Sequence, residues 1–268
     1  MVQANALVMA ASRKGPLDSV AQMQNKSHKC LVTIDGEVML VRVINALFDS
    51  GHIGTVYVSI EGEEPLRTVP QLAKWLDEGR VRVAKSEGNL ADSVLAGVEQ
   101  MDNPYPFLIT TGDNALHTPE LIRDFMEQFW KLDGDVALGF TTEEVVAKEI
   151  PDSGLAYHRL KDGGHSSCNL YGMRREKALN GVRVFASGGQ FGKRHIRILK
   201  AFGIMPFILY KLRAVGIHKM ATSLGRGVGV SVDIIDLPYA YGPIDVDNPR
   251  SFALSERLLQ ARRKSAAA

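Results

Sequence analysis

The chain has 268 residues, of which 45% are hydrophobic and 23% charged, and its formal net charge is +2. This is the composition of a globular protein with a sizeable core, and no stretch reaches the roughly 18 uncharged apolar residues of a membrane-spanning helix. Its two cysteines, Cys30 and Cys168, give neither a disulfide framework nor zinc spacing, and no basic leader precedes the first apolar run. We therefore expect a soluble protein of a reducing, cytoplasmic compartment.

Apolar strands alternate with amphipathic helices through the first half of the sequence. Continuous apolar runs, typical of buried parallel strands, predict strands at residues 6–10, 55–60, 81–84, 107–111 and 135–140. One helix is predicted from Glu37 to a stop at Gly51. Asn89 is the expected N-cap of the next, and Thr118 with Pro119 opens a third. This alternation predicts an α/β fold of three layers, α/β/α, around a mostly parallel mixed sheet.

The second half of the sequence is less regular. Its predicted elements are strands and turns at 155–173, two short helices within 191–220, a strand at 228–237 and a closing helix at 250–263. Two short helices are favoured over one long helix because Gly203, Pro206 and Gly216 interrupt the helical pattern. We predict a single domain over residues 1–268, with a basic helical insertion at about 187–222.

The insertion belongs to a segment without acidic residues. From Lys177 to Val232 there are ten Lys and Arg residues and no Asp or Glu, which leaves 22 basic against 30 acidic residues elsewhere. An anionic partner and a solvated basic face are equally good interpretations. The segment lacks aromatic residues spaced for base stacking, so we expect no nucleic acid. For residues 191–220, a lid over an acceptor site, a weak contact with an anionic membrane and a homodimer surface stay open.

A long basic loop follows the first predicted strand. Its cationic residues are Arg13, Lys14, Lys26, His28 and Lys29. Only one acidic residue, Asp18, lies among them. Loops of this length in compact domains are usually functional or disordered. An exposed lysine such as Lys29 is also commonplace on protein surfaces, so the residues alone leave its role open.

Three carboxylates follow predicted strands. Asp113 comes directly after the strand at 107–111, and Asp245 and Asp247 lie in GPIDVDNP between the last strand and the last helix. Ligands of parallel α/β sheets bind beyond the carboxyl ends of the strands, where paired carboxylates suit a hard divalent cation that substrate phosphates also ligate. Taken alone, each aspartate is more often a turn or cap residue. Together with the basic loop they favour phosphate chemistry.

The order and spacing of these features resemble the MobA-like nucleotidyltransferases, which have the Rossmann-like nucleotide-diphospho-sugar transferase (GT-A) fold. The family's opening signature is an apolar strand, a loop with Gly and Arg, a lysine and a helix. It resembles VMAASRKG followed by HKCLVTIDGEVMLVRVINAL. The resemblance covers approximately residues 5–140 and 230–260. Ser12 and Lys14 stand where the family has glycines, and the loop to Lys29 is longer than usual.

The resemblance implies roles for particular residues. Asp113 and Asp247 would hold Mg²⁺, and Lys29, Arg13 and Asp113 would be the catalytic residues. The nucleotide-binding residues that it implies are Ala10, Ala11, Ser12, Arg13, Lys29, Gly88, Asn89, Ser93 and Gly112. Asp245 is expected to be a supporting or turn residue. The remaining expectations are core packing for Cys30, an acceptor contact or a strand cap for Asn169, and structural or surface positions for His28, His117 and His165.

The activity that the resemblance implies is Mg²⁺-dependent transfer of an NMP group from an NTP to a small phosphorylated acceptor, with release of pyrophosphate. A glycosyltransferase of the related fold is an alternative. Those enzymes usually carry Asp-x-Asp after the central strand, whereas Asp133-Gly134-Asp135 precedes a predicted strand here. A catalytically silent nucleotide-binding protein is a third reading, because the loop glycines are replaced. The identity of the base and of the acceptor stays open.

Overall fold

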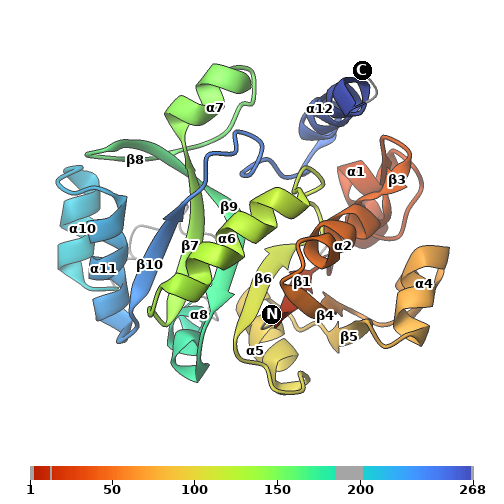
Figure 1. The fold of residues 1–268 in the computed structure, drawn as a ribbon, viewed down its shortest axis with the longest axis horizontal. Coiled ribbons are helices and arrows are strands. Elements are labelled where there is room, and N and C mark those ends of the chain that lie inside the picture. The colour runs from red at the N-terminus through yellow and green to blue at the C-terminus, as the bar shows by residue number, and fades with distance from the viewer. Residues whose placement is uncertain (1–2, 13, 185–201, 267–268) are drawn as a thin grey trace.

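The computed structural model describes residues 3–12, 14–184 and 202–266 (Figure 1). The strands of the central sheet are β1 (Ala4–Met9), β4 (Ile53–Ile60), β5 (Val81–Lys85), β6 (Phe107–Thr111), β7 (Val136–Thr142), β8 (His158–Leu160), β9 (Gly163–Met173) and β10 (Val232–Asp236). A separate hairpin consists of β2 (Thr33–Ile34) and β3 (Glu37–Val38).

The helices connect and cover these strands. The α-helices are α1 (Ser19–Gln22), α2 (Met39–Asp49), α3 (Glu64–Arg67), α4 (Pro70–Asp77), α5 (Leu90–Glu99), α6 (Pro119–Lys131), α7 (Glu143–Glu149), α8 (Leu179–Arg183), α10 (Ile204–Lys211), α11 (Ile217–Val228) and α12 (Pro249–Ala266). Short 3₁₀ turns are η1 (Gly15–Leu17), η2 (Lys29–Leu31) and η3 (Glu176–Ala178). No helix in the described ranges has the length and apolar character needed to cross a bilayer.

The sheet is mixed and mostly parallel, as predicted. Its order is β10-β7-β9-β6-β1-β4-β5, with β8 paired to β9. The pairs β1–β4, β1–β6, β4–β5 and β7–β10 are parallel. Among the described strands of this sheet, only the pairings of β9, with β6, β7 and β8, are antiparallel. The carboxyl ends of the parallel strands therefore share one edge of the sheet.

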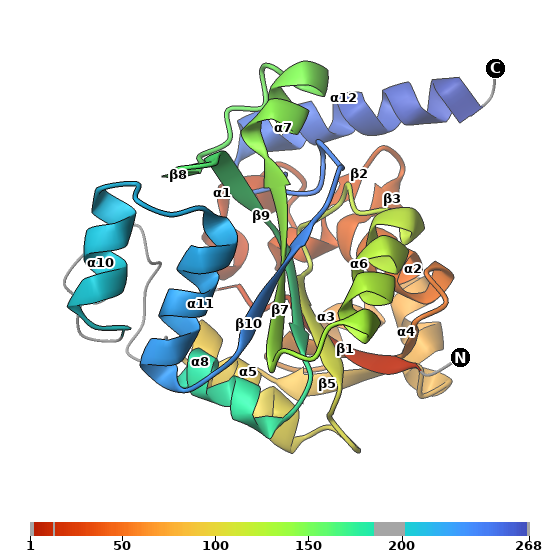
Figure 2. The same cartoon turned by 60° about the vertical axis from the view of Figure 1, so that its left-hand side comes forward.

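Helices cover both faces of the sheet, which confirms the three-layer prediction. On one face α2, α4 and α6 lie against the strands, and on the other lie α5 and α8 (Figures 1 and 2). Phe125 and Phe129 of α6 are fully buried on the first face, whereas Val94 and Val98 of α5 pack with Phe107 on the second. This arrangement leaves the carboxyl edge of the sheet for loops.

Helix α12 lies over that carboxyl edge. Its Phe252 and Leu259 belong to a buried cluster that also contains Val146 of α7, Ile34 of β2 and Val246 of the preceding loop. Figure 2 shows α12 crossing the same end of the sheet as α7. The packing of α12 therefore fixes the loop that carries Asp245 and Asp247 against the rest of the edge.

Two predicted boundaries were wrong for reasons of local conformation. The segment Glu37–Val38 pairs with β2 because Asp35 and Gly36 form a turn with positive φ, so α2 begins only at Met39. At the other end of the chain, α11 continues to Val228 and ends at Gly229, whose φ of 70° gives a left-handed C-cap. Strand β10 therefore starts at Val232 and not at Val228. Residues 187–201 of the predicted insertion lie outside the described residues.

Candidate active site

Asp113 is held at the carboxyl end of β6. The Thr111 hydroxyl donates a hydrogen bond to Oδ1 of Asp113. Between them, Gly112 is buried, and a Cβ at this position would lie 3.2 Å from Cβ of Cys30 and 3.4 Å from Cβ of Ala10. A side chain at position 112 would therefore push the end of β6 away from the loop that follows β1. Glycine at this position lets the two segments lie in close contact.

Asp245 and Asp247 reach the same place from the loop before α12. The backbone N–H of Val246 donates to the carbonyl of Asp113 at 3.1 Å, which ties this loop to the end of β6. Asn248 accepts hydrogen bonds from the backbone N–H groups of Arg250 and Ser251 and so caps α12. The DVDNP sequence thus both starts a helix and presents two carboxylates at its N-terminal end.

Lys29 bridges two of the three carboxylates. Its Nζ lies 2.6 Å from Oδ2 of Asp113 and 2.7 Å from Oδ1 of Asp247. Burial by itself would lower the pKa of Lys29, but the charges and hydrogen bonds of Asp113 and Asp247 outweigh it and raise the pKa. Lys29 is therefore a fixed positive charge at the sheet edge, although it lies far from both partners in the sequence.

Asp245, which was expected to be a supporting or turn residue, completes the cluster. One ligand atom from each of Asp113, Asp245 and Asp247 lies within 4.8 Å of the others. Burial, followed by the like charges of Asp113 and Asp247, raises the pKa of Asp245 to about 7. Three converging carboxylate oxygens are the hard donors that Mg²⁺ prefers, so the residues present fit that ion.

The loop after β1 starts beside this cluster. The Ala10 carbonyl lies 3.6 Å from Sγ of Cys30, and the backbone N–H of Ser12 donates to Oε1 of Glu61 at 3.2 Å. The other oxygen of Glu61 lies 2.9 Å from Nε2 of His28, so Glu61 joins the two ends of the loop. Ala11 is exposed at this position. Arg13 lies outside the described residues.

The loop between β5 and α5 lies at the same sheet edge, but two of its expected nucleotide ligands are used internally. Asn89 accepts the backbone N–H of Asp92 and caps α5, as predicted. The Ser93 hydroxyl is buried and bonds to the backbone N–H and carbonyl of Glu87. Gly88 is exposed with open space around it. Asn89 and Ser93 therefore shape the loop, and its backbone near Gly88 is the part left for a ligand.

The other singled-out side chains are mostly structural. Cys30 is buried, and burial raises the pKa of its thiol to about 12, which argues against a nucleophile. His117 and His165 are buried too. His117 bonds to the carbonyl of Gly242 through Nε2. Asn169 has a φ of 52° on β9, and its Oδ1 accepts a hydrogen bond from the Tyr171 hydroxyl.

A comparison with protein-family models gives a match over residues 12–204 to the MobA-like NTP transferase domain, which is well over half of the chain. The chain belongs to the MobA-like NTP transferase family. The match includes Lys29 and Asp113 but ends before the loop with Asp245 and Asp247. A comparison with proteins of curated function finds no match.

Solved structures that resemble this MobA-like chain have the same fold. A hypothetical transferase from Thermus thermophilus has a TM-score of 0.74 at 20% identity, covering 94% of this chain and 100% of that one. A 4-diphosphocytidyl-2C-methyl-D-erythritol synthase from Anaerococcus prevotii has a TM-score of 0.58 at 12% identity, covering 97% and 99%. A CMP:2-keto-3-deoxy-manno-octonic acid synthetase complexed with CTP has a TM-score of 0.57 at 12% identity, again covering 97% and 99%.

Sequence reasoning did not assign two residues that the structure places at the site of this MobA-like chain. Glu61 directly follows β4, the same position relative to its strand that drew attention to Asp113, and that signal could have identified it. Asp245 was expected to be a supporting or turn residue and not a ligand, although it lies two residues from Asp247. The structure brings Lys29, Asp113, Asp245 and Asp247 together. The contact between Ser12 and Glu61 lies beyond the ends of β1 and β4.

Proposed function

We propose that this MobA-like chain transfers an NMP group from an NTP to a small phosphorylated acceptor, with release of pyrophosphate. The observation that carries the proposal is the convergence of Lys29 and three aspartates at the carboxyl edge of the sheet, beside the loop that follows β1. A nucleoside triphosphate needs both a cation site and a positive side chain, and this edge offers both within one cluster.

We propose Asp113, Asp245 and Asp247 as the residues that hold Mg²⁺. Bound there, the ion would neutralise phosphate charge and orient the triphosphate. The protein prepares the site by tying the Asp245–Asp247 loop to the carbonyl of Asp113 through Val246. The hydrogen bond from Thr111 fixes the Asp113 carboxylate in the same way.

Lys29 is proposed to exchange its carboxylate partners for phosphate oxygens of the NTP. Its high pKa keeps the ammonium charged at neutral pH, as a phosphate contact requires. The backbone N–H groups from Ala10 to Ser12 are proposed to cradle phosphate, with Arg13 as an additional cation. The Ser12 N–H already binds a carboxylate oxygen of Glu61, which supports an anion-binding role for this turn.

A phosphorylated acceptor supplies its own nucleophilic oxygen, so the proposal needs no activated side chain. The buried Cys30 agrees with this. The glycosyltransferase alternative is weakened, because Asp133 and Asp135 lie before β7, at the opposite edge of the sheet. Both of them form ion pairs with Arg175 there.

The proposal is tested by thermal-shift and pyrophosphate-release measurements on the wild type and Asp113→Asn. Each of CTP, ATP, GTP and UTP is added with and without Mg²⁺. CTP comes first because two similar structures carry cytidine nucleotides in their titles. A ligand at about 100 times its Kd adds about 2.7 kcal/mol of stability. One NTP should raise the wild-type midpoint in a Mg²⁺-dependent way, and Asp113→Asn should lose that shift.

Asp49→Asn is the matched control, because Asp49 is an exposed aspartate on α2, away from the cluster. It should behave like the wild type. The responding NTP is then combined with sugar, polyol, pterin and lipid phosphates in the pyrophosphate assay. Binding of an NTP without pyrophosphate from any acceptor would favour a silent nucleotide-binding protein. A shift with nucleotide sugars alone would favour the glycosyltransferase.

A further inference from the structure

Helix α10 is apolar on both sides, and the described residues pack against one of them. Leu209 and Tyr210 pack against the cluster formed with Ile217 and Met220 of α11. The other side exposes a stripe of large apolar residues with the exposed fractions Ile204 63%, Met205 59%, Ile208 39% and Leu212 72%. Spacings of four residues place Ile204, Ile208 and the C-cap residue Leu212 on one helix face. Exposed apolar stripes of this kind mark interaction surfaces.

Cations without carboxylate partners flank this stripe. Lys161, Lys211, Arg213 and Lys219 are all exposed. Within the described ranges none of them forms an ion pair, whereas sixteen other pairs are formed there. From residue 202 to 232 the sequence has no Asp or Glu. The surface around α10 and the start of α11 therefore carries four cations that form no ion pair within the described ranges.

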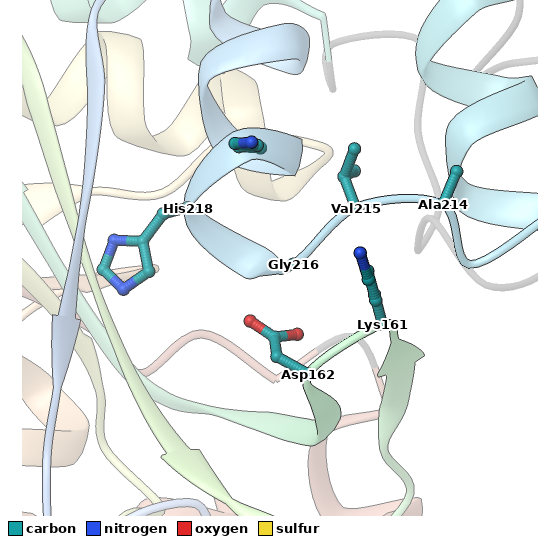
Figure 3. Close-up of a pocket in the computed structure, with 7 residues that line it drawn as sticks. Lys161, Asp162, Ala214, Val215, Gly216 and His218 are labelled. Atoms are coloured by element: carbon teal, nitrogen blue, oxygen red, sulfur yellow. The ribbon is translucent and has the colours of Figure 1, made fainter.

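A shallow hollow of about 210 Å³ opens between β8 and the connection from α10 to α11. Lys161, His218 and Lys219 line it, together with Asp162 (Figure 3). The two oxygens of Asp162 are already used, because Oδ2 accepts the backbone N–H of Ile217 and Oδ1 lies 3.0 Å from Nε2 of His165. Lys161 and Lys219 therefore share a concave place with Ala214 and Val215, which follow Leu212 closely in the chain.

We propose that this surface binds an anionic lipid bilayer. We define the α10 face as the exposed apolar residues and flanking cations together: Ile204, Met205, Ile208, Leu212, Lys161, Lys211, Arg213 and Lys219. The apolar side chains insert at the boundary between headgroups and acyl chains, and the cations bind headgroup phosphates. The hollow at Lys161 and Lys219 binds one headgroup phosphate.

Charge decides between a membrane and a second copy of the chain. An isologous dimer through the α10 face would bring its four cations against four identical ones, and Asp162, the one carboxylate that lines the hollow, is already bonded to Ile217 and His165. An anionic bilayer neutralises them all. The contact is peripheral, because no described helix is able to span a bilayer.

Co-sedimentation of the purified full chain with vesicles tests the proposal. Phosphatidylcholine vesicles with about 30% phosphatidylglycerol should bind the protein, pure phosphatidylcholine should not, and about 1 M salt should weaken binding because the Debye length falls to about 3 Å. Lys211→Glu with Lys219→Glu should lower the partition coefficient at least about tenfold. Ile208→Ser with Leu212→Ser should lower it at unchanged charge.

The matched control is Lys131→Glu with Lys264→Glu, which changes the net charge equally at exposed lysines on α6 and α12. It should keep wild-type binding, and melting temperatures should show that all variants fold. An equal fall in the partition coefficient of the control would mean that net charge alone attracts the protein to the vesicles. That result would overturn the proposal that the α10 face is the binding surface. Absence of vesicle binding by the wild type would overturn the proposal too. If the wild type then sediments as a dimer, and Ile208→Ser with Leu212→Ser makes it a monomer, a second copy of the chain is the occupant of the α10 face.

Discussion

Asp135 and Asp245 lie at opposite edges of the same sheet and are held in opposite ways. Asp135 precedes β7 and is only 2% exposed. Its Oδ2 accepts hydrogen bonds from the backbone N–H and the hydroxyl of Ser231, both at 2.8 Å, and Arg175 and Lys177 pair with the carboxylate. Burial would raise the pKa of Asp135, but these partners outweigh it and lower the pKa.

Asp245 has the reverse environment. It follows β10, and Asp113 and Asp247 add negative charge next to it, which together with burial raises its pKa to about 7. The charge of Lys29 also acts on Asp245, but Lys29 forms its ion pairs with the other two aspartates. A carboxylate whose charge is compensated stabilises the fold, whereas one left partly uncompensated is suited to receive a cation. The comparison predicts that substitution of Asp245 lowers activity without lowering stability, and that substitution of Asp135 does the reverse.

The largest expected effect is the loss of turnover in Asp245→Asn. Removing one of three converging carboxylates should reduce pyrophosphate release about a hundredfold or more. The free energy of unfolding at pH 8 should stay the same or rise by about 1 kcal/mol, because one of three like charges is gone. Urea unfolding and the pyrophosphate assay measure the two quantities on the same preparation. Wild-type turnover in this variant would return Asp245 to the role of a loop residue.

Asp135→Asn should do the opposite. It leaves Arg175 and Lys177 without a buried counter-ion, which should cost about 3 kcal/mol in the free energy of unfolding. The NTP should still raise the melting temperature of this variant, measured from the lower melting temperature of the variant without nucleotide. Asp133→Asn is the control, because Asp133 is fully exposed and pairs with the same arginine, so its loss should cost under about 1 kcal/mol. Equal costs for both variants would contradict the assignment of Asp135 as the structural carboxylate.

A smaller effect tests whether burial alone shifts a pKa at the carboxyl edge. Burial lowers the pKa of His117 to about 4, against about 6.5 in an unfolded chain. The folded state therefore binds fewer protons, and stability is present above pH 6.5 and lost as the pH falls toward 4. Between pH 6.5 and 5 the wild type should lose about 2 kcal/mol more than His117→Gln.

Urea titrations at several pH values measure this difference. Identical slopes for the wild type and His117→Gln would show that His117 charges without cost in the folded state.

The sheet could be predicted from the sequence because its signals are local. Continuous apolar runs mark the strands, and Asn89 and Thr118 cap the helices that the pattern predicts. The position of Asp113 followed from the same rule, since it directly follows a strand. These features depend on a few neighbouring residues, and no distant contact is needed to recognise them.

The detailed site could not be predicted because its contacts join distant segments. The role of Asp245 depends on the hydrogen bond from Val246 to the carbonyl of Asp113. The link from Ser12 through Glu61 to His28 joins three separate segments in the same way. The internal use of Ser93 also depends on how the loop from Glu87 folds back on α5. Only a folded chain displays these pairings.

The order of these segments along the chain sets the time at which the proposed site forms during synthesis. Lys29 and Asp113 leave the ribosome early, but both are held by a loop that begins beyond residue 240 and is fixed by the packing of α12. A nascent or cleaved chain that ends before Asp245 would contain the whole family-matched region, residues 12–204, and still lack two of the three carboxylates. Such a chain would therefore lack the cation site proposed above, because two of its three carboxylates lie in a segment that is made after the family-matched region.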